Sequence, residues 1–279
     1  MNAAFSHYSG SGDKEGFDGW LSKASCVRWL QRTIPAAREF VGPTTLYTDS
    51  TGAKNLESVP FDKVVTCYDS LDSSLPWQLG IMKVGQDVLT EPYIHVDADL
   101  WLLNPLTVEF ASSDVVFECY ERDHIHETAW FESLKGVQDL PEFPEILRPV
   151  AGRSVQCSGV GGLSGGCDFE FQHKTFAQVW KMLYAHPEVA AEWGDKLMFL
   201  LDQWFPANMA WEQGKRVALM YDGDVTTLNP DWPDAKNRIG HFHLWHDSKQ
   251  FSDWYLQGCP GGMNVLGARD IWIRENIGT

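Results

Sequence analysis

Two carboxylates that follow a strand-like run are the residues of this chain best suited to metal chemistry. The run from Tyr93 to Val96 is mostly apolar and leads directly into Asp97, Ala98 and Asp99. In an extended chain successive side chains point to opposite sides, so Asp97 and Asp99 are predicted to share one side. Two hard oxygen ligands suit Mg²⁺ or Mn²⁺, which complete their coordination with water and phosphate oxygens. The pair therefore predicts a divalent-cation site that can hold a diphosphate.

The ordinary alternative for an isolated Asp-x-Asp is a solvated acidic turn. Here the pair lies between two apolar segments, one ending at Val96 and one starting at Leu100. Because a carboxylate is costly to bury without a partner, this setting favours metal binding over a solvated turn.

A second candidate is the segment from Cys157 to Asp168, which holds five glycines within eight residues. Glycine lets the backbone approach a ligand closely, and Gly161 and Gly162 are the candidate contacts. The segment has neither the Gly-Lys-Ser/Thr of a P-loop nor the Gly-x-Gly-x-x-Gly turn of an early βαβ unit. The alternative is a glycine-rich hairpin or bulge that binds nothing.

A third candidate is the pair Asp202 and Gln203, which stands among apolar residues at an apparent helix start, ahead of Asn208. An aspartate in that place can be a simple N-cap, because it accepts from free backbone N–H groups.

A fourth candidate is the dense polar run of His241, His243, His246, Asp247 and Lys249. In a strand His241 and His243 share a side, so one of them can supply the nitrogen that completes an Asp-Asp site.

An α/β layout is expected to position these residues, because apolar runs of strand length alternate with segments of helical period. A helix with a proline break is predicted over 20–40, another helix over 77–89, and an irregular excursion over 139–152. Phe176, Val179, Trp180 and Leu183 recur at helical spacing and are predicted to face the core. Strands are predicted at 45–47, 64–68, 93–96, 115–119 and 217–221.

Composition limits the class of protein. The 279 residues, 44% of them apolar, are enough for one domain with a full core. A formal net charge of -16 argues against nucleic-acid partners, whose phosphates are held by clustered Lys and Arg. Neither a signal peptide nor a membrane-length apolar run is visible, so a soluble cytoplasmic protein without a transmembrane segment is expected.

In this order the four segments resemble the glycosyltransferases of the GT-A fold, over about residues 3 to 250. The nearest branch is the glycogenin-like and bacterial galactosyl- or glucosyltransferase-like one, which works with retention. The resemblance implies a single α/β domain over 1–279, with a mixed central sheet flanked by helices. A Rossmann-like nucleotide-sugar half would cover about 1–110. An acceptor half with the C-terminal metal and diphosphate segment would cover 111–279.

The resemblance also implies roles for single residues. Asp97 and Asp99 would hold Mn²⁺, or Mg²⁺, with His243 as the third ligand and His241 as its alternative. Lys249, six residues after His243, would bind the diphosphate. In this chain His246 stands where the family's His-x-x-Gly-x-x-Lys motif has glycine.

Further donor and catalytic residues follow from the same resemblance. Asp202 and Gln203 would be catalytic, with Asp202 nearest the anomeric carbon. Tyr8 would stack on the nucleobase and Lys83 would reach the donor, although Tyr8 could equally cap the core and Lys83 could be a solvated helix residue. Ser158-Gly159-Val160 would be the counterpart of the family's Asn-x-Gly-Val segment, without its Asn.

The implied function is metal-dependent transfer of a hexose from a nucleoside-diphosphate sugar, with UDP-sugars favoured, to a glycan, lipid, small molecule or protein. Two other classes stay open. A non-catalytic carbohydrate-binding module could use the acidic pair with Ca²⁺. A sugar-phosphate nucleotidyltransferase would need a glycine-rich loop after its first strand. Residues 9–14 contain two glycines and match such a loop only weakly.

Overall fold

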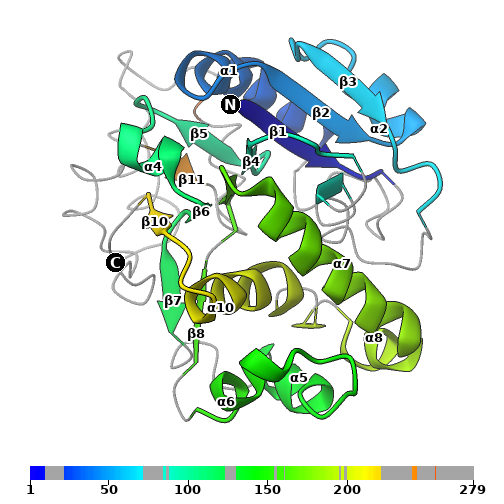
Figure 1. Cartoon of the computed structure of the whole chain (residues 1–279). Helices are drawn as coiled ribbons and strands as arrows, with labels where there is room; N and C mark the ends of the chain where they lie inside the picture. Colours follow the sequence, from blue (N-terminus) through cyan, green and yellow to red (C-terminus); the bar gives the residue numbers. More distant parts are fainter. Residues whose placement is uncertain are drawn as a thin grey trace, which may run out of the picture.

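The protein has an α/β fold in which a seven-stranded mixed sheet is flanked by helices (Figure 1). The computed structural model describes residues 1–9, 22–71, 84–85, 88–122, 130–153, 156–159, 161–194, 196–197, 200–220, 241–243 and 255. The sheet order is β10-β6-β9-β4-β1-β2-β3. Its strands are β1 (Asn2–His7), β2 (Thr44–Thr48), β3 (Lys63–Thr66), β4 (Tyr93–Val96), β6 (Val115–Phe117), β9 (Leu163–Gly166) and β10 (Val217–Leu219). The predicted fold class is confirmed at this level, and each of the five predicted strands overlaps an observed one.

Strand direction divides the sheet at β9. The neighbours β3, β2, β1 and β4 are parallel, and β6 and β10 are parallel to each other. Only β9 runs against the other strands of this sheet, because it pairs antiparallel with both β4 and β6. The order of the first four strands reverses between β1 and β4. In open α/β sheets ligands bind outside the carboxyl ends of the strands at such a reversal.

Two short antiparallel pairs lie beside the main sheet. Strand β5 (Leu100–Leu102) pairs with β11 (His241–His243), and β7 (Tyr120–Arg122) pairs with β8 (Cys157–Gly159). His241 and His243 therefore do lie in a strand, which is the condition under which they were expected to share a side. The hairpin alternative for the glycine-rich segment is wrong, because β8 and β9 pair with different strands instead of with each other.

Helix α1 (Lys23–Phe40) runs unbroken through Pro35, so the predicted proline break is wrong. Its N-cap Ser22 accepts a hydrogen bond from the amide of Ser25. A proline inside a helix costs about 3 kcal/mol. Packing of the buried face, which includes Leu30 and Ile34, offsets that cost. The other helices are α2 (Ser50–Asn55), α4 (Val108–Ser112), α5 (Trp130–Val137), α6 (Arg148–Ala151), α7 (Phe169–Ala185), α8 (Pro187–Trp193) and α10 (Phe205–Glu212).

The segment 139–152 is more ordered than its composition predicts. It contains a 3₁₀ helix (Glu145–Leu147) followed by α6, and the side chains of Leu147 and Val150 are buried. Its apolar residues join a core cluster with α7, on which Phe176, Val179, Trp180 and Leu183 are buried as predicted. A second cluster, around α1, β1, β2 and β4, forms the core of the first half. Of the predicted helix 77–89, the structure describes only 84, 85, 88 and 89, and the first two are helical.

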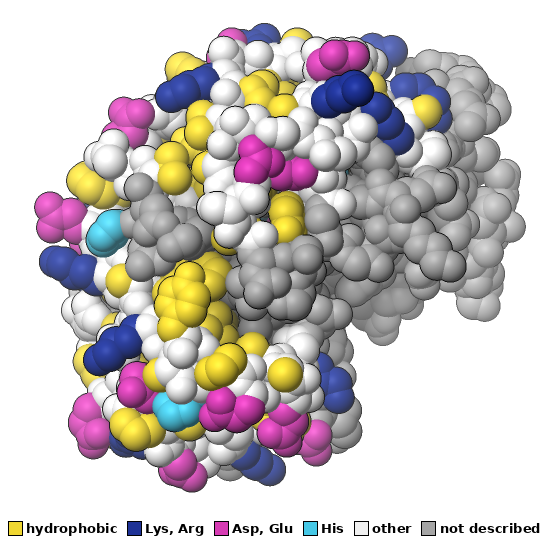
Figure 2. Space-filling view, turned by 90° about the vertical axis from the view of Figure 1, so that its right-hand side faces the viewer, with side chains coloured by type: hydrophobic (Ala, Val, Ile, Leu, Met, Phe, Trp, Pro, Cys, Tyr) yellow, Lys and Arg dark blue, Asp and Glu magenta, His cyan; other side chains and the backbone are white. Residues whose placement is uncertain are grey.

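On the face of the molecule in Figure 2, acidic and basic side chains are interspersed with hydrophobic ones over the part that the structure describes. Tyr184 on α7 is the most exposed aromatic side chain among the described residues, at 66%, and its ring packs on Trp180. No helix within the described ranges is both long and apolar enough to cross a membrane.

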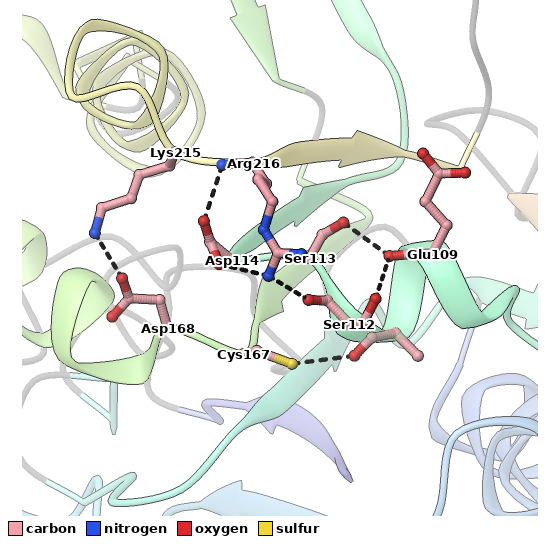
Figure 3. A network of polar contacts seen from close by, with 9 residues as sticks. Glu109, Ser112, Ser113, Asp114, Cys167, Asp168, Lys215 and Arg216 are labelled. Atoms are coloured by element: carbon pink, nitrogen blue, oxygen red, sulfur yellow. Dashed lines mark hydrogen bonds and ion pairs between the residues drawn. The ribbon is translucent and has the colours of Figure 1, made fainter.

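A polar network ties β10 to the start of α7 and to β6 (Figure 3). The Lys215 ammonium donates to Asp168 at 2.6 Å, and the Arg216 guanidinium donates to Asp114 at 2.9 Å. Hydrogen bonds from Arg216 lower the pKa of Asp114. Burial raises the pKa of Asp168, but hydrogen bonds from Lys215 and from the amide of Phe171 outweigh it, and the net shift is downward. Both carboxylates therefore stabilise the fold while they are ionised.

We expect the variant Asp168→Asn to lose stability at pH 7 but not at pH 2. Asparagine keeps the oxygen that caps α7 but lacks the charge that faces Lys215. Because the folded-state pKa of Asp168 is lowered, its contribution is complete above the unfolded pKa of about 3.9 and disappears as pH falls through the folded value. Urea unfolding should give a deficit of about 1 kcal/mol at pH 7 that closes towards pH 2. A deficit independent of pH would contradict the assignment.

Candidate functional site

The sheet topology brings the predicted site segments to one edge. Asp97 follows β4 and Tyr8 follows β1, both at the carboxyl ends of parallel strands. Because β9 is antiparallel, the residues that precede it, Gly161 and Gly162, lie at this same edge. Glu118, which follows β6, is also there and is buried. The edge includes the reversal between β1 and β4, where this class of sheet binds ligands.

Asp97 and Asp99 lie in a turn and not in an extended strand. The Leu100 amide donates to the Asp97 carbonyl at 3.0 Å, which closes the turn between β4 and β5. The prediction that Asp97 and Asp99 share a side as alternate positions of an extended strand is therefore wrong. The Asp97 amide donates to the Gly162 carbonyl at 3.0 Å, so the glycine segment fixes the start of this turn. Both aspartates are partly exposed.

Asp202 and Gln203 lie in a single π-helical turn (Leu200–Trp204) that continues directly into α10. Single π turns often occur at functional sites. Asp202 is inside this turn, so the N-cap alternative is wrong. Asp202 Oδ1 and Gln203 Oε1 are buried and have no hydrogen-bond partner among the described residues. Two buried acceptor atoms without donors are costly, and a ligand that carries donors or positive charge would relieve that cost.

The π turn faces both the acidic turn and the glycine segment. Burial raises the pKa of Asp202 well above its usual value, and the nearby charge of Asp97 raises it further. A Cβ atom added to Gly161 would lie 3.5 Å from Cγ of Gln203, so the two residues are neighbours. The structure thus brings Asp97, Gly161, Gly162, Asp202 and Gln203 together. A cation bound between the carboxylates would reverse the electrostatics and favour ionised Asp202.

Buried amides hold the π turn in place. The Trp204 indole donates to Gln156 Oε1 at 3.1 Å, and Gln156 Nε2 donates to the carbonyl of Arg153 at 2.8 Å. Asn208 Nδ2 donates to the carbonyls of Trp204 and Cys157, both at 2.8 Å. Asn208, which follows Asp202 and Gln203 in the predicted segment, therefore ties the π turn to β8.

His95 is a site-lining residue that the sequence reasoning missed. It is on β4, 4% exposed, and its Nε2 lies 3.1 Å from Ser6 Oγ. Its Nδ1 lies 3.6 Å from Asp97 Oδ1. Burial lowers the pKa of His95 to about 4, so the imidazole is neutral at neutral pH. A histidine within an otherwise apolar strand, two residues before Asp97, was the available signal.

Tyr8 packs edge to face on Tyr68, and its hydroxyl donates to the Leu71 carbonyl at 3.4 Å. These contacts match its core-capping alternative, and stacking on a base stays a prediction. Lys83 and Lys249 lie outside the described residues.

The third metal ligand is only partly located. His243 pairs in register with Leu100, the neighbour of Asp99, which brings its backbone next to the acidic turn. His241 pairs with Leu102, farther along β5. Only the backbones of the two histidines are described. Within the described ranges no three His, Cys, Asp or Glu side chains form a group that could hold a metal ion. The oxygen donors on the acidic turn nevertheless have the hard chemistry that Mg²⁺ and Mn²⁺ prefer.

A protein-family model matches residues 9–257, which extends from the end of β1 beyond β11 and includes the acidic turn, the glycine segment and the π turn. The chain belongs to family DUF6734. This is a family of unknown function. A comparison with curated proteins finds no match.

Proposed function

We propose that the protein is a metal-dependent glycosyltransferase, which moves a sugar from a nucleoside-diphosphate sugar to an acceptor with retention. One observation carries the proposal. Asp202, whose Oδ1 is buried without a partner among the described residues, is close to Asp97 at the carboxyl edge where the strand order reverses.

The acidic turn would hold the cation. Asp97 and Asp99 offer carboxylate oxygens at the end of β4, and His243 on the paired strand β11 would be the third ligand. When bound, the Mn²⁺ or Mg²⁺ supplies positive charge that stabilises the diphosphate leaving group. At a carboxylate-lined edge of a protein with a formal net charge of -16, such a cation would offset the repulsion between the carboxylates and a diphosphate.

The π turn would hold the sugar. Asp202 Oδ1 and Gln203 Oε1 are hydrogen-bond acceptors, and sugar hydroxyl groups are donors of matching chemistry. Gly161, which lies beside Gln203 and has no side chain, leaves room for a ring to approach the backbone. An ionised Asp202 beside the anomeric carbon would stabilise the positive charge that develops there as the bond to the diphosphate breaks.

Thermal shift with nucleotides tests this function first. UDP, GDP, CDP, ADP and their sugar conjugates would be added with and without Mn²⁺. We expect one nucleotide, with UDP favoured, to raise the Tm only when Mn²⁺ is present, because a ligand of the native state stabilises it. The variant Asp99→Asn should lose the shift. No shift with any nucleotide would overturn the proposal and favour a carbohydrate-binding module, and pyrophosphate release would indicate a nucleotidyltransferase.

A further inference from the structure

A chain of three polar side chains, with the buried His95 at its centre, leads from β1 to the acidic turn. Ser6 on β1 and His95 on β4 project from neighbouring parallel strands, with Ser6 Oγ 3.1 Å from His95 Nε2. The other imidazole nitrogen, Nδ1, is 3.6 Å from Asp97 Oδ1. Polar side chains are rare on this strand, whose Tyr93, Ile94 and Val96 are buried in apolar clusters. His95 therefore connects two polar groups across an otherwise apolar layer.

The contacts on the two sides of the ring select one tautomer. The Ser6 hydroxyl can either donate to Nε2 or accept from it. If Nε2 carried the hydrogen, the lone pair of Nδ1 would face the Asp97 carboxylate and repel it. If Ser6 donates to Nε2, the hydrogen is on Nδ1 and points to Asp97. The separation of 3.6 Å is longer than a hydrogen bond, and contacts of this kind tighten when a ligand completes a site.

We propose that His95 is a positioning residue, which uses its Nδ1–H to hold the Asp97 carboxylate in the orientation that binds the divalent cation. The inference rests on the proposed function, because Asp97 is a ligand only if the acidic turn binds a metal. Partners of this kind orient carboxylate and imidazole ligands in metal sites, and their loss costs about 10- to 100-fold in metal affinity. Ser6 contributes indirectly, by fixing the tautomer of His95.

Two amide substitutions separate the two ends of the imidazole. Asparagine can place its amide nitrogen where Nδ1 is, towards Asp97, whereas glutamine reaches the position of Nε2, towards Ser6. Mn²⁺ binding to the full chain would be measured by titration with paramagnetic resonance of the free ion. We expect His95→Asn to bind Mn²⁺ nearly as well as the wild type, and His95→Gln to bind about 10- to 100-fold more weakly. Unfolding midpoints of both variants would be recorded beside the titrations.

A double-mutant cycle removes the contribution of general stability. In an Asp97→Asn background, His95→Gln should cause no further loss of Mn²⁺ affinity, because the carboxylate that it positions is gone. The variant Ser6→Ala leaves His95 in place and should weaken Mn²⁺ binding by a smaller factor than His95→Gln.

Three outcomes would overturn the inference. His95→Gln binding Mn²⁺ as tightly as the wild type would overturn the positioning role alone. Equal losses in the Asp97 and Asp97→Asn backgrounds would show that His95 acts through the fold and not through Asp97. A wild-type protein that binds no Mn²⁺ would overturn the metal-dependent function and the positioning role with it.

Discussion

Replacing Asp202 by Asn should lower sugar transfer by about 10³-fold or more while leaving Mn²⁺-dependent nucleotide binding nearly intact. The variant loses the negative charge next to the anomeric carbon but keeps the side-chain shape and one acceptor oxygen. Asp97 and Asp99, which would hold the cation and diphosphate, are unchanged. The effect should therefore be on kcat, because the charge matters most in the transition state.

The same substitution is expected to stabilise the protein in the absence of ligands. Asp202 Oδ1 is buried without a described partner and is close to the like charge of Asp97, so a neutral amide removes an electrostatic cost. Replacing a residue that serves a site at the expense of the fold commonly raises the free energy of unfolding by about 1 kcal/mol.

Transfer, donor hydrolysis and the Tm would be measured for Asp202→Asn, with the exposed Asp139→Asn as a control that should change none of them. Lost nucleotide binding or surviving transfer in Asp202→Asn would contradict the catalytic role. A lower Tm with activity lost would point to a structural role for this carboxylate.

Replacing Gly166 by Ala should destabilise the fold by about 3 kcal/mol or more. Gly166 has φ +134, a conformation that residues with side chains rarely adopt. A Cβ atom there would lie 2.3 Å from the backbone carbonyl oxygen of Asp114. Because Gly166 lies on β9, between β4 and β6, neither neighbouring backbone can move without breaking the sheet. The glycine is required by close strand packing and not by a ligand.

Gly214→Ala is the matched control. Gly214 also has positive φ, +67, but a Cβ atom would meet nothing within 4 Å. Alanine there should cost only the conformational preference, about 1 kcal/mol. Urea unfolding of both variants would separate conformational strain from steric overlap. Similar losses at the two positions would contradict the steric explanation for Gly166.

The sequence by itself determined the local helices and strands and the types of side chain that are available to a site. Alternation of apolar runs and helical periods predicted the α/β class, because hydrophobic spacing reflects which faces are buried. It located the strand before Asp97 and the buried face of α7. The residue types also limited any cation at Asp97 and Asp99 to one that accepts hard oxygen ligands.

Local patterns were less reliable where tertiary contacts decide. The proline in α1 predicted a break, but core packing on both sides of Pro35 keeps the helix continuous. A hairpin was one alternative for the glycines between Cys157 and Asp168, but β8 and β9 pair with different strands, and Gly165 and Gly166 are inside the main sheet. The turn at Asp97 was also missed, because its start is held by a hydrogen bond from the Asp97 amide to the distant Gly162.

Only the tertiary structure decided which polar groups meet. Strand order, with β9 inserted antiparallel between β4 and β6, brings Gly162 against Asp97 and leaves the π turn facing both. The buried oxygen of Asp202, which has no partner among the described residues, and the approach of His95 to Asp97 follow from that arrangement. Spacing along the chain encodes which face a residue occupies. Proximity between distant segments depends on how sheet and helices pack, which sequence periodicity does not specify.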